Sequence, residues 1–338
     1  MKICIKHRTT YNYNEPVAFG QHKIMIRPRE GHDLHIESSI LEIKPAHSIH
    51  WMRDVNGNSI AKVDFTEEAA QLMIYSELRL QHYDSNPLDF IVDDSAVHYP
   101  FVYEPDAQPE LAAFMHIIYP KDTARLREWL TQFWKPGDKT ETIVLLQNVT
   151  KHIYDNFKYE RRDEAGVQTP AQTLEKNSGS CRDFATLMLE ACRCWGLAAR
   201  FVSGYMQCEA TEAGGASTHA WAEIYLPGAG WKGFDPTCGI MTASQHVTVA
   251  VARDPENAAP ISGSFSGPPN AFLNIQVDVS VTQEDKPVPV ANIPIQSQIQ
   301  VPPISDPTVQ PQVEQMAQQA SAPMDMVIHA EPVALSAS

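Results

Sequence analysis

Three residues of the types that catalyse acyl transfer occur in order along this chain of 338 residues, Cys181, His219 and Asp235. Cys181 follows the segment Asn-Ser-Gly-Ser and opens a stretch with helical apolar periodicity, so we expect it at the start of a helix. The first turn of a helix has unpaired backbone N–H groups and the positive end of the helix dipole, which both stabilise a thiolate. The chain therefore offers a candidate nucleophile, a base and a carboxylate that orients the base.

Each of these residues also has an ordinary structural interpretation. Ser180 and Asp183 resemble a capping box with Asp in place of Glu, and capping is the simpler role for both. A single histidine on a strand is more often structural than catalytic, and Asp-Pro-Thr is commonly a turn that ends a strand. The combination indicates a site, because His219 and Asp235 fall on successive predicted strands after the predicted cysteine helix.

Whether His219 and Asp235 can meet depends on the turn between their strands. On the predicted strand 219–226, His219 and Trp221 lie on a polar and aromatic face, and small or aliphatic residues form the other. Asp235 shares the His219 face if the loop has an odd number of residues or if a bulge shifts the register. A four-residue loop at 227–230 would point it away, so both arrangements stay open.

We also assign two residues beside the candidate triad to substrate binding, Trp221 and Arg182, although helix geometry equally allows Arg182 to be a solvated side chain. Two nearby loops have two interpretations each. Arg161 and Arg162, in YERRDEAGVQ, are candidates for contact with an acidic substrate or for simple solvation. Gly214-Gly215 is compatible with a flap over the site or with a surface turn.

The cysteine pattern indicates neither a metal site nor a disulfide framework. The six cysteines are unevenly spaced, at positions 4, 181, 192, 194, 208 and 238. Cys192 and Cys194 are two residues apart on a predicted helix and face different directions, so they form a poor chelating pair. A reducing cytoplasm fits this pattern best, and we expect no metal and no cofactor.

Period-2 alternation dominates the first hundred residues. Six segments have this pattern, namely KICIKHRTTYNY, HKIMIRPR, LHIESSILEIKP, SIHWMRDV, SIAKVDF and QLMIYSELRLQHY. Asn56-Gly57 between the fourth and fifth segments is a strong hairpin signal. We predict an all-β sandwich domain over residues 1–105.

After Pro105 the period becomes helical. Asp122 and Thr140 are predicted N-caps of two helices, Thr169-Pro170 opens a short one, and Cys181 opens a long one that ends at Gly196. Three strands then follow, ARFVSGYM, HAWAEIYL and GWKGFDPT. Residues 106–286 are therefore predicted to form a helical connector and an α+β core, with helices packed on an antiparallel sheet.

Residues 287–338 contain no Gly, no aromatic residue, no Lys and no Arg, and Pro alternates there with Gln, Ser, Ala and Val. We expect a disordered tail that is a candidate ligand for an unknown protein. The net charge of −15 and the absence of basic runs argue against nucleic acid as a partner. Neither a signal-peptide core nor a membrane-spanning apolar stretch is evident, so we expect no membrane contact.

The motifs resemble the bacterial transglutaminase-like superfamily, cysteine hydrolases and acyltransferases with a circularly rearranged papain-like core. GSCRDFATLMLEACRCWGLAARFVSGY is similar to its nucleophile segment, and THAWAEIYLPGAGWKGFDPT to its His and Asp segments. The resemblance implies Cys181 as nucleophile, His219 as base and Asp235 as its orienter. The segments from YNYNEP to WMRDVNGN resemble the β-rich N-terminal domain of such proteins.

Two positions depart from the family pattern. Arg182 stands where Gln is usual, and Cys238 stands where Asn often follows Asp-Pro-Thr. Cys238 is compatible with a regulatory disulfide to Cys181 or with an inert buried thiol.

The resemblance implies a thioester intermediate on a peptide or protein amide substrate, and leaves the reaction open. A peptidase or amidase is the leading hypothesis. A protein-glutamine crosslinking acyltransferase, an acetyl-coenzyme A acyltransferase and a catalytically silent binding or assembly module are the alternatives. The sequence has no basic pocket for the coenzyme's phosphates, which weighs against the acetyl-coenzyme A acyltransferase.

Overall fold

The computed structural model describes residues 1–83, 86–162, 164, 166–207 and 218–284. Met1–Lys286 forms one compact unit. The expected tail, the Gly214-Gly215 segment (flap or surface turn) and Cys208 lie outside the described residues. No helix among the described residues combines the length and the apolar character needed to cross a membrane.

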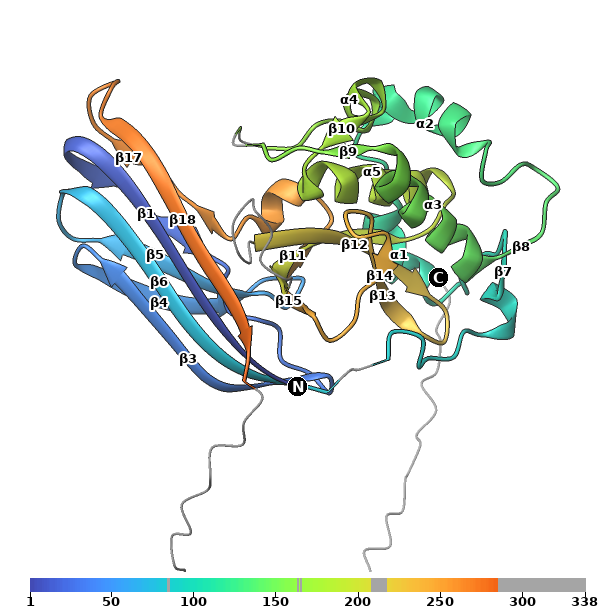
Figure 1. Cartoon of the computed structure of the whole chain (residues 1–338), viewed down its shortest axis with the longest axis horizontal. Coiled ribbons are helices and arrows are strands. Elements are labelled where there is room, and N and C mark those ends of the chain that lie inside the picture. Colours follow the sequence, from blue (N-terminus) through green and yellow to red (C-terminus); the bar gives the residue numbers. More distant parts are fainter. Residues whose placement is uncertain (84–85, 163, 165, 208–217, 285–338) are drawn as a thin grey trace, which may run out of the picture. The chain divides into compact units, whose positions relative to one another are not determined.

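The N-terminal half forms two antiparallel sheets, as predicted (Figure 1). One sheet contains β1 (Lys2–Phe19), β3 (Leu34–Lys44), β6 (Ala69–His82), β17 (Phe265–Ser266) and β18 (Phe272–Gln283). The other contains β2 (His22–Ile24), β4 (His47–Arg53), β5 (Ser59–Phe65) and β16 (Ile261–Ser262). The predicted hairpin joins β4 to β5, and Gly57 has a φ of 76° in its turn, a conformation that favours glycine.

Aliphatic side chains from both sheets pack together, which accounts for the alternating pattern. This cluster consists of Ile24, Ile26, Ile43, Ala61, Val63, Leu72 and Ile74. The inward positions of β1 and β6 are buried, while most of β3 and β4 is exposed or partly exposed. The fold class predicted for this region, a β sandwich, is confirmed.

The strands β16, β17 and β18 pair with β1 and β2, more than 200 residues earlier in the chain. The change from period-2 alternation to helical periodicity after Pro105 predicts that residues 106–286 all belong to the helical connector and core. Strand pairing instead places the segment from Ile261 to Gln283 in the N-terminal sheets.

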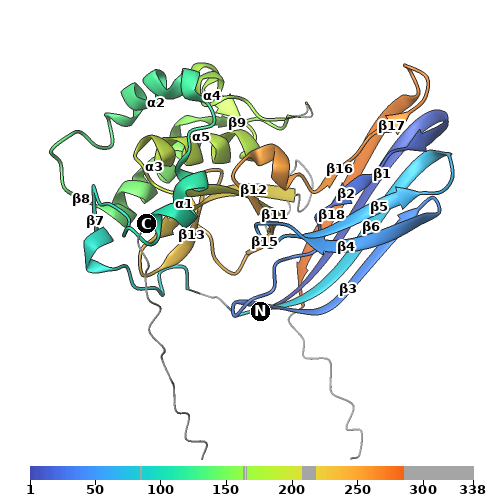
Figure 2. The same ribbon diagram turned by 180° about the vertical axis from the view of Figure 1, so that it is seen from behind.

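The second half has helices packed on one antiparallel sheet, as predicted. The sheet order is β14 (Ile240–Met241), β13 (Gly230–Asp235), β12 (Thr218–Leu226), β11 (Ala199–Met206) and β15 (His246–Ala252). The helices are α1 (Gln108–Met115), α2 (Thr123–Leu130), α3 (Thr142–Asn156), α4 (Pro170–Lys176) and α5 (Cys181–Cys194). Apolar faces of α3 and α5 share one core cluster with β11, β12 and β13 (Figures 1 and 2).

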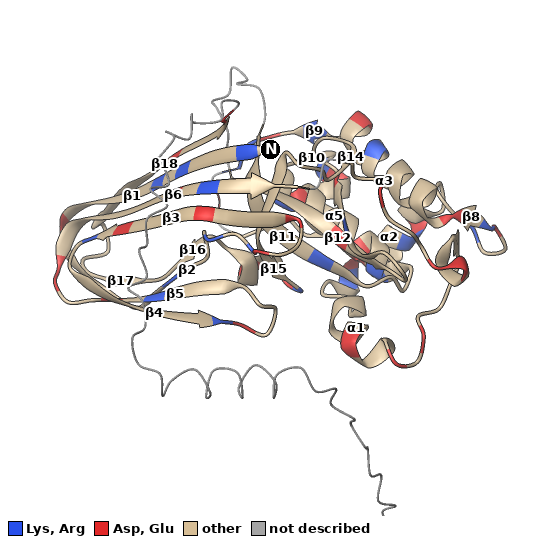
Figure 3. Cartoon of the chain, turned by 90° about the horizontal axis from the view of Figure 1, so that it is seen from below, with Lys and Arg blue, Asp and Glu red and all other residues tan. Residues whose placement is uncertain are grey.

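Short elements connect these parts. Two-stranded pairs form between β7 (His98–Tyr99) and β8 (Thr140–Glu141), and between β9 (Lys158–Tyr159) and β10 (Ser178–Gly179). In the part of the chain that the structure describes, 3₁₀ turns cover Asp94–Ala96, Pro120–Asp122 and Pro255–Ala258. Figure 3 shows Lys and Arg scattered along the strands and helices, with acidic residues between them.

The predicted helix starts are partly confirmed. Thr169 caps α4 with a reciprocal Gln172 bond, and α5 begins at Cys181 after its N-cap Ser180. The predicted Thr140 cap is wrong, because Thr140 belongs to β8 and α3 begins at Thr142. The Thr142 hydroxyl instead donates to the Ala96 carbonyl, which fixes this helix start to the preceding segment.

His7 of β1 is buried against Tyr205 of β11. Its Nδ1 lies 2.7 Å from the Tyr205 hydroxyl and its Nε2 lies 2.9 Å from Thr9 Oγ1. Burial lowers the pKa of His7 to about 4. The side chain is therefore neutral in the folded protein at pH values where an unfolded histidine is already protonated.

The free energy of unfolding is expected to fall by about 3 kcal/mol as the pH drops from 6.5 to 4, because only the unfolded state takes up the proton in this window. Above pH 6.5 both states are neutral and the effect vanishes. Urea unfolding of wild type and His7→Gln between pH 7 and 4 measures it: the stability advantage of wild type should shrink as the pH falls. The exposed His50→Gln serves as control, and an advantage that stays constant for His7→Gln would contradict the assignment.

Candidate functional site

Hydrogen bonds around Asp183 fix the start of α5. The Asp183 carboxylate accepts from the backbone N–H of Ser180 at 2.8 Å and from the Ser180 hydroxyl at 2.9 Å, so the predicted capping contact is present. It also accepts from the Gln168 N–H at 2.7 Å and pairs with the Arg162 guanidinium at 2.7 Å. Burial raises the pKa of this carboxyl, but these bonds outweigh it and hold the pKa below its ordinary value. A buried anion thus anchors the turn that presents Cys181.

The loop before α4 lies against the same turn. Tyr159 of β9 pairs in parallel with Gly179 of β10, two residues before Cys181. A side chain at Gly179 would press on Asp183, so the close approach requires glycine. Partial burial and the nearby Cys181 sulfur raise the pKa of the Tyr159 hydroxyl, while His219 lowers it. The half-exposed Tyr159 is therefore a site residue that sequence analysis missed.

Arg182 has partners in the protein. Its guanidinium donates to the backbone carbonyls of Arg162 and Glu164, at 3.2 and 3.1 Å. Arg162 in turn pairs with Asp183. The two arginines hold the charged loop to the start of α5, so neither is merely solvated. A substrate role for Arg182 stays a prediction.

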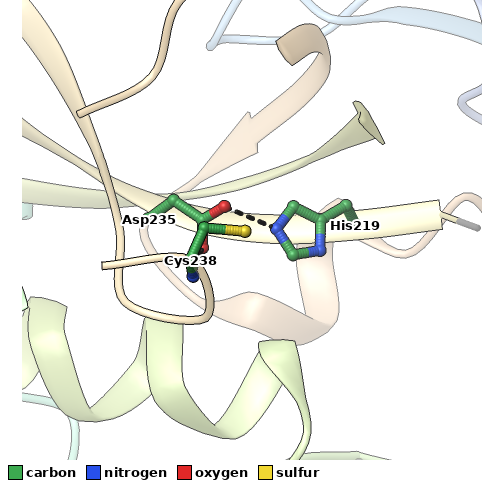
Figure 4. Close-up of side chains that lie close together, drawn as sticks. All are labelled: His219, Asp235 and Cys238. Carbon is green, nitrogen blue, oxygen red and sulfur yellow. Dashed lines mark hydrogen bonds and ion pairs between the residues drawn. The ribbon is translucent and has the colours of Figure 1, made fainter. Parts of the chain in front are cut away.

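The register of β12 and β13 decides the question that the sequence left open. Leu226 pairs with Gly230, so the loop has three residues, 227–229. An odd loop places Asp235 on the His219 face. Asp235 Oδ2 lies 2.8 Å from His219 Nε2, and Figure 4 shows the two side chains pointing at each other. The structure thus brings these two predicted residues together.

Asp235 is buried and fully hydrogen-bonded. Its Oδ1 accepts from the backbone N–H groups of Thr237 and Cys238, at 2.8 and 3.3 Å. Its Oδ2 lies near two imidazoles, His219 at 2.8 Å and His246 at 3.1 Å. Burial raises the pKa of the carboxyl, but the bonds to both histidines outweigh it, and the pKa lies well below its ordinary value. Asp235 is an anion whose orientation is fixed from both sides.

His219 contacts the nucleophile candidate as well as Asp235. Burial lowers the pKa of its imidazole, but hydrogen bonds with Asp235, Cys181 and Cys238 outweigh burial and hold the pKa well above the ordinary value. Cys181 itself is 9% exposed at the first position of α5. His219 thus shares a hydrogen bond with Asp235 and interacts electrostatically with Cys181.

His246, at the start of β15, is a second site residue that sequence analysis missed. Its Nδ1 accepts from the Ala243 N–H at 3.3 Å. The neutral ring must then carry its proton on Nε2 and donate it to Asp235. A histidine opening an alternating strand gives no signal of its own, and only the sheet order brings it to Asp235.

Trp221 lies behind the imidazoles. It is 1% exposed, packs with Val202 and Val251, and has its ring edge-on to His246 at 5.2 Å. A side chain at Gly204 would collide with this ring, so glycine makes room for it. Trp221 therefore supports the histidines from behind, and its contact with a substrate stays a prediction.

Cys238 lies beside His219 and Asp235, and Figure 4 shows its sulfur directed toward the imidazole. Cys238 Sγ also lies 3.6 Å from Met206 Sδ. Burial raises the pKa of this thiol. Cys181 and Cys238 are both free thiols.

Comparisons with known proteins agree with this arrangement. Residues 134–236 match the transglutaminase-like superfamily, and residues 3–81 match the bacterial transglutaminase-like N-terminal region. The first match contains all three candidate catalytic residues.

The relatives by sequence carry no assigned function. An uncharacterized protein of Mycobacterium tuberculosis H37Rv is 28% identical over 302 residues, covering 81% of this chain and 91% of the relative. The uncharacterized YebA of Bacillus subtilis is 35% identical over 120 residues, 32% of this chain and 16% of YebA. Among solved structures, a proposed cysteine protease from Cytophaga hutchinsonii has a TM-score of 0.64 at 21% identity, covering 85% of this chain and 92% of that one. This likeness shows a shared fold.

Proposed function

Because the chain belongs to the transglutaminase-like superfamily and carries the bacterial transglutaminase-like N-terminal region, we propose that it is a cysteine peptidase or amidase. Its substrate is a peptide-like amide, and the intermediate is a thioester on Cys181. The observation that carries the proposal is the 2.8 Å hydrogen bond between His219 and Asp235, with Cys181 at the start of α5 raising the pKa of the same imidazole.

The first step is attack of the Cys181 sulfur, as thiolate, on the amide carbonyl carbon. The tetrahedral oxyanion would accept from backbone N–H groups at the start of α5, where no intrahelical acceptor precedes Cys181 and Arg182. His219 then gives its proton to the leaving nitrogen, the C–N bond breaks, and an amine departs.

The second step resolves the thioester. The neutral His219 takes a proton from water while the water oxygen attacks the thioester carbon, which releases a carboxylic acid and restores the thiolate. An acceptor amine in place of water would give a new amide, the crosslinking alternative. Asp235, held by His246 and two backbone N–H groups, keeps the imidazole oriented through both steps.

Intact-protein mass spectrometry tests the thioester. The protein is incubated with an activated ester, p-nitrophenyl acetate, and with benzyloxycarbonyl-Gln-Gly. A covalent acyl adduct that hydroxylamine removes, located on the peptide with Cys181 and absent in Cys181→Ala, is expected. Cys194→Ala, which removes a partly buried thiol at the far end of α5, should still form it. An adduct retained by Cys181→Ala would refute the assignment of the nucleophile.

The same experiment distinguishes hydrolysis from transfer. Monodansylcadaverine is added after the acyl-enzyme has formed, and the products are separated by mass. Release of the free acid at an unchanged rate supports a peptidase or amidase. Quantitative capture by the amine would support the crosslinking acyltransferase instead.

A further inference from the structure

We propose that His219, Asp235 and Cys238 form a binding site for one zinc ion, which switches off the thiol chemistry. The sequence predicts no metal site, because no cysteine or histidine pair has the spacing of a ligand motif. The fold supplies the proximity that the spacing lacks: one donor atom from each of these three side chains lies within 4.8 Å of the other two. The proposal rests on these side chains, and not on the hydrolase activity proposed above.

The donor set is one that zinc takes in proteins, an imidazole nitrogen, a carboxylate oxygen and a thiolate sulfur. Hard cations such as Mg²⁺ and Ca²⁺ require oxygen ligands and would reject the sulfur. A second sulfur, Met206 Sδ, lies 3.6 Å from Cys238 Sγ, which makes this side of the site softer still.

The geometry requires only small adjustments. Two nitrogen or oxygen ligands about 2.1 Å from a tetrahedral zinc ion lie about 3.4 Å apart, and a sulfur lies about 3.6 Å from either of them. His219 Nε2 and Asp235 Oδ2 are now 2.8 Å apart, with a proton between them. The ion would replace that proton and spread the pair by roughly half an ångström, while the Cys238 sulfur, within 4.8 Å of one donor atom of each partner, moves inward by at most about 1.2 Å.

A preformed outer set of contacts supports the carboxylate. His246 donates to Asp235 Oδ2, and the backbone N–H groups of Thr237 and Cys238 hold Oδ1. Such outer contacts orient metal-binding carboxylates in proteins. The Thr237 hydroxyl oxygen in the same turn is buried and has no hydrogen-bond partner among the described residues, so the turn can still accept a polar group.

Zinc and catalysis compete for the same imidazole. With the ion on Nε2, the His219 ring loses its bond to Asp235 and keeps its remaining proton on Nδ1, so it can no longer accept a proton from the Cys181 sulfur or from water. Cys238 is then the residue that converts a catalytic pair into a three-ligand site, while the fourth position stays open to water.

Zinc binding is measured first in Cys181→Ala, so that the nucleophile cannot account for it and activity plays no part. Competition with a chromophoric chelator should give one Zn²⁺ per chain. Adding Cys238→Ala to this protein should weaken binding about 100-fold or more, and Cys194→Ala should leave it unchanged. Equal affinity with and without the Cys238 thiol would overturn the proposal, as would binding in wild type that disappears in Cys181→Ala.

Cobalt gives a readout that folding defects do not mimic. Co²⁺ added to Cys181→Ala should produce a thiolate charge-transfer band that is missing in Cys181→Ala/Cys238→Ala, with the circular dichroism spectra of both unchanged.

In wild type, Zn²⁺ should slow iodoacetamide labelling of Cys181 and a chelator should restore it. In the Cys238→Ala protein, the rate of Cys181 labelling should not respond to Zn²⁺. A band that persists without Cys238 would contradict the site. Failure of the thioester test alone would leave the zinc measurements intact, because they require no turnover.

Discussion

The Asp235→Asn protein is expected to turn over an activated ester about 10⁴-fold more slowly than wild type, the loss seen when the orienting aspartate of such a triad becomes an amide. The structure explains why the amide cannot substitute for the carboxylate. Asp235 accepts on both oxygens and has backbone N–H donors on one and imidazoles on the other.

An asparagine at position 235 must direct its NH₂ group either toward the two backbone N–H donors or toward the two imidazoles. If NH₂ replaces Oδ1, it faces the N–H groups of Thr237 and Cys238. If it replaces Oδ2, it faces the Nε2–H of His246 and forces His219 into the tautomer with its proton on Nδ1, the wrong one for catalysis. In both orientations the NH₂ group faces another hydrogen-bond donor and both groups lose a partner, so we also expect a lower melting temperature.

Steady-state kcat for p-nitrophenyl acetate measures the effect, and nitrogen chemical shifts of the His219 ring report its tautomer. The matched control is Asp155→Asn, an exposed aspartate of α3 that pairs with Lys151. A kcat within tenfold of wild type would show that Asp235 has no orienting role.

Local patterns predicted much of this fold and part of the site. Helical periodicity and an N-cap serine placed α5 within one residue, and alternation identified the six N-terminal strands, because these signals depend only on neighbours in sequence. The order of Cys181, His219 and Asp235 could be identified for the same reason. The contact between His219 and Asp235 could not be predicted, because it depends on whether the loop after Leu226 has three or four residues.

The residues that sequence analysis missed or misplaced all depend on long-range pairing. His246 reaches Asp235 only because β15 pairs with β11 on the far side from β12. Trp221 is buried because Gly204 on the neighbouring strand leaves room for its ring. Residues 272–283 alternate like any strand, and nothing local shows that they pair with β1. Periodicity specifies that a strand exists, while its partner is set by packing of the whole unit.

The His219→Ala protein should lose about 10⁶-fold in kcat, as expected when the base of a triad is removed. Cys181 would then have no group to exchange its proton, and Asp235 would be left as a buried anion held by His246 and two backbone N–H groups. His246→Ala should lose only about 10²-fold, because this ring acts through Asp235 and its removal misplaces the pair without deleting the base.

The rank order of these two variants separates a catalytic from a positioning histidine. Both are measured with p-nitrophenyl acetate beside His152→Ala, which removes an imidazole in edge-on contact with Trp129 and Phe133. The pH dependence of kcat should keep the wild-type shape in His246→Ala, since its base is intact. If His246→Ala were as inactive as His219→Ala while remaining folded, the proton would have to pass through the second imidazole. Asp235 would then connect two catalytic histidines, in place of orienting one.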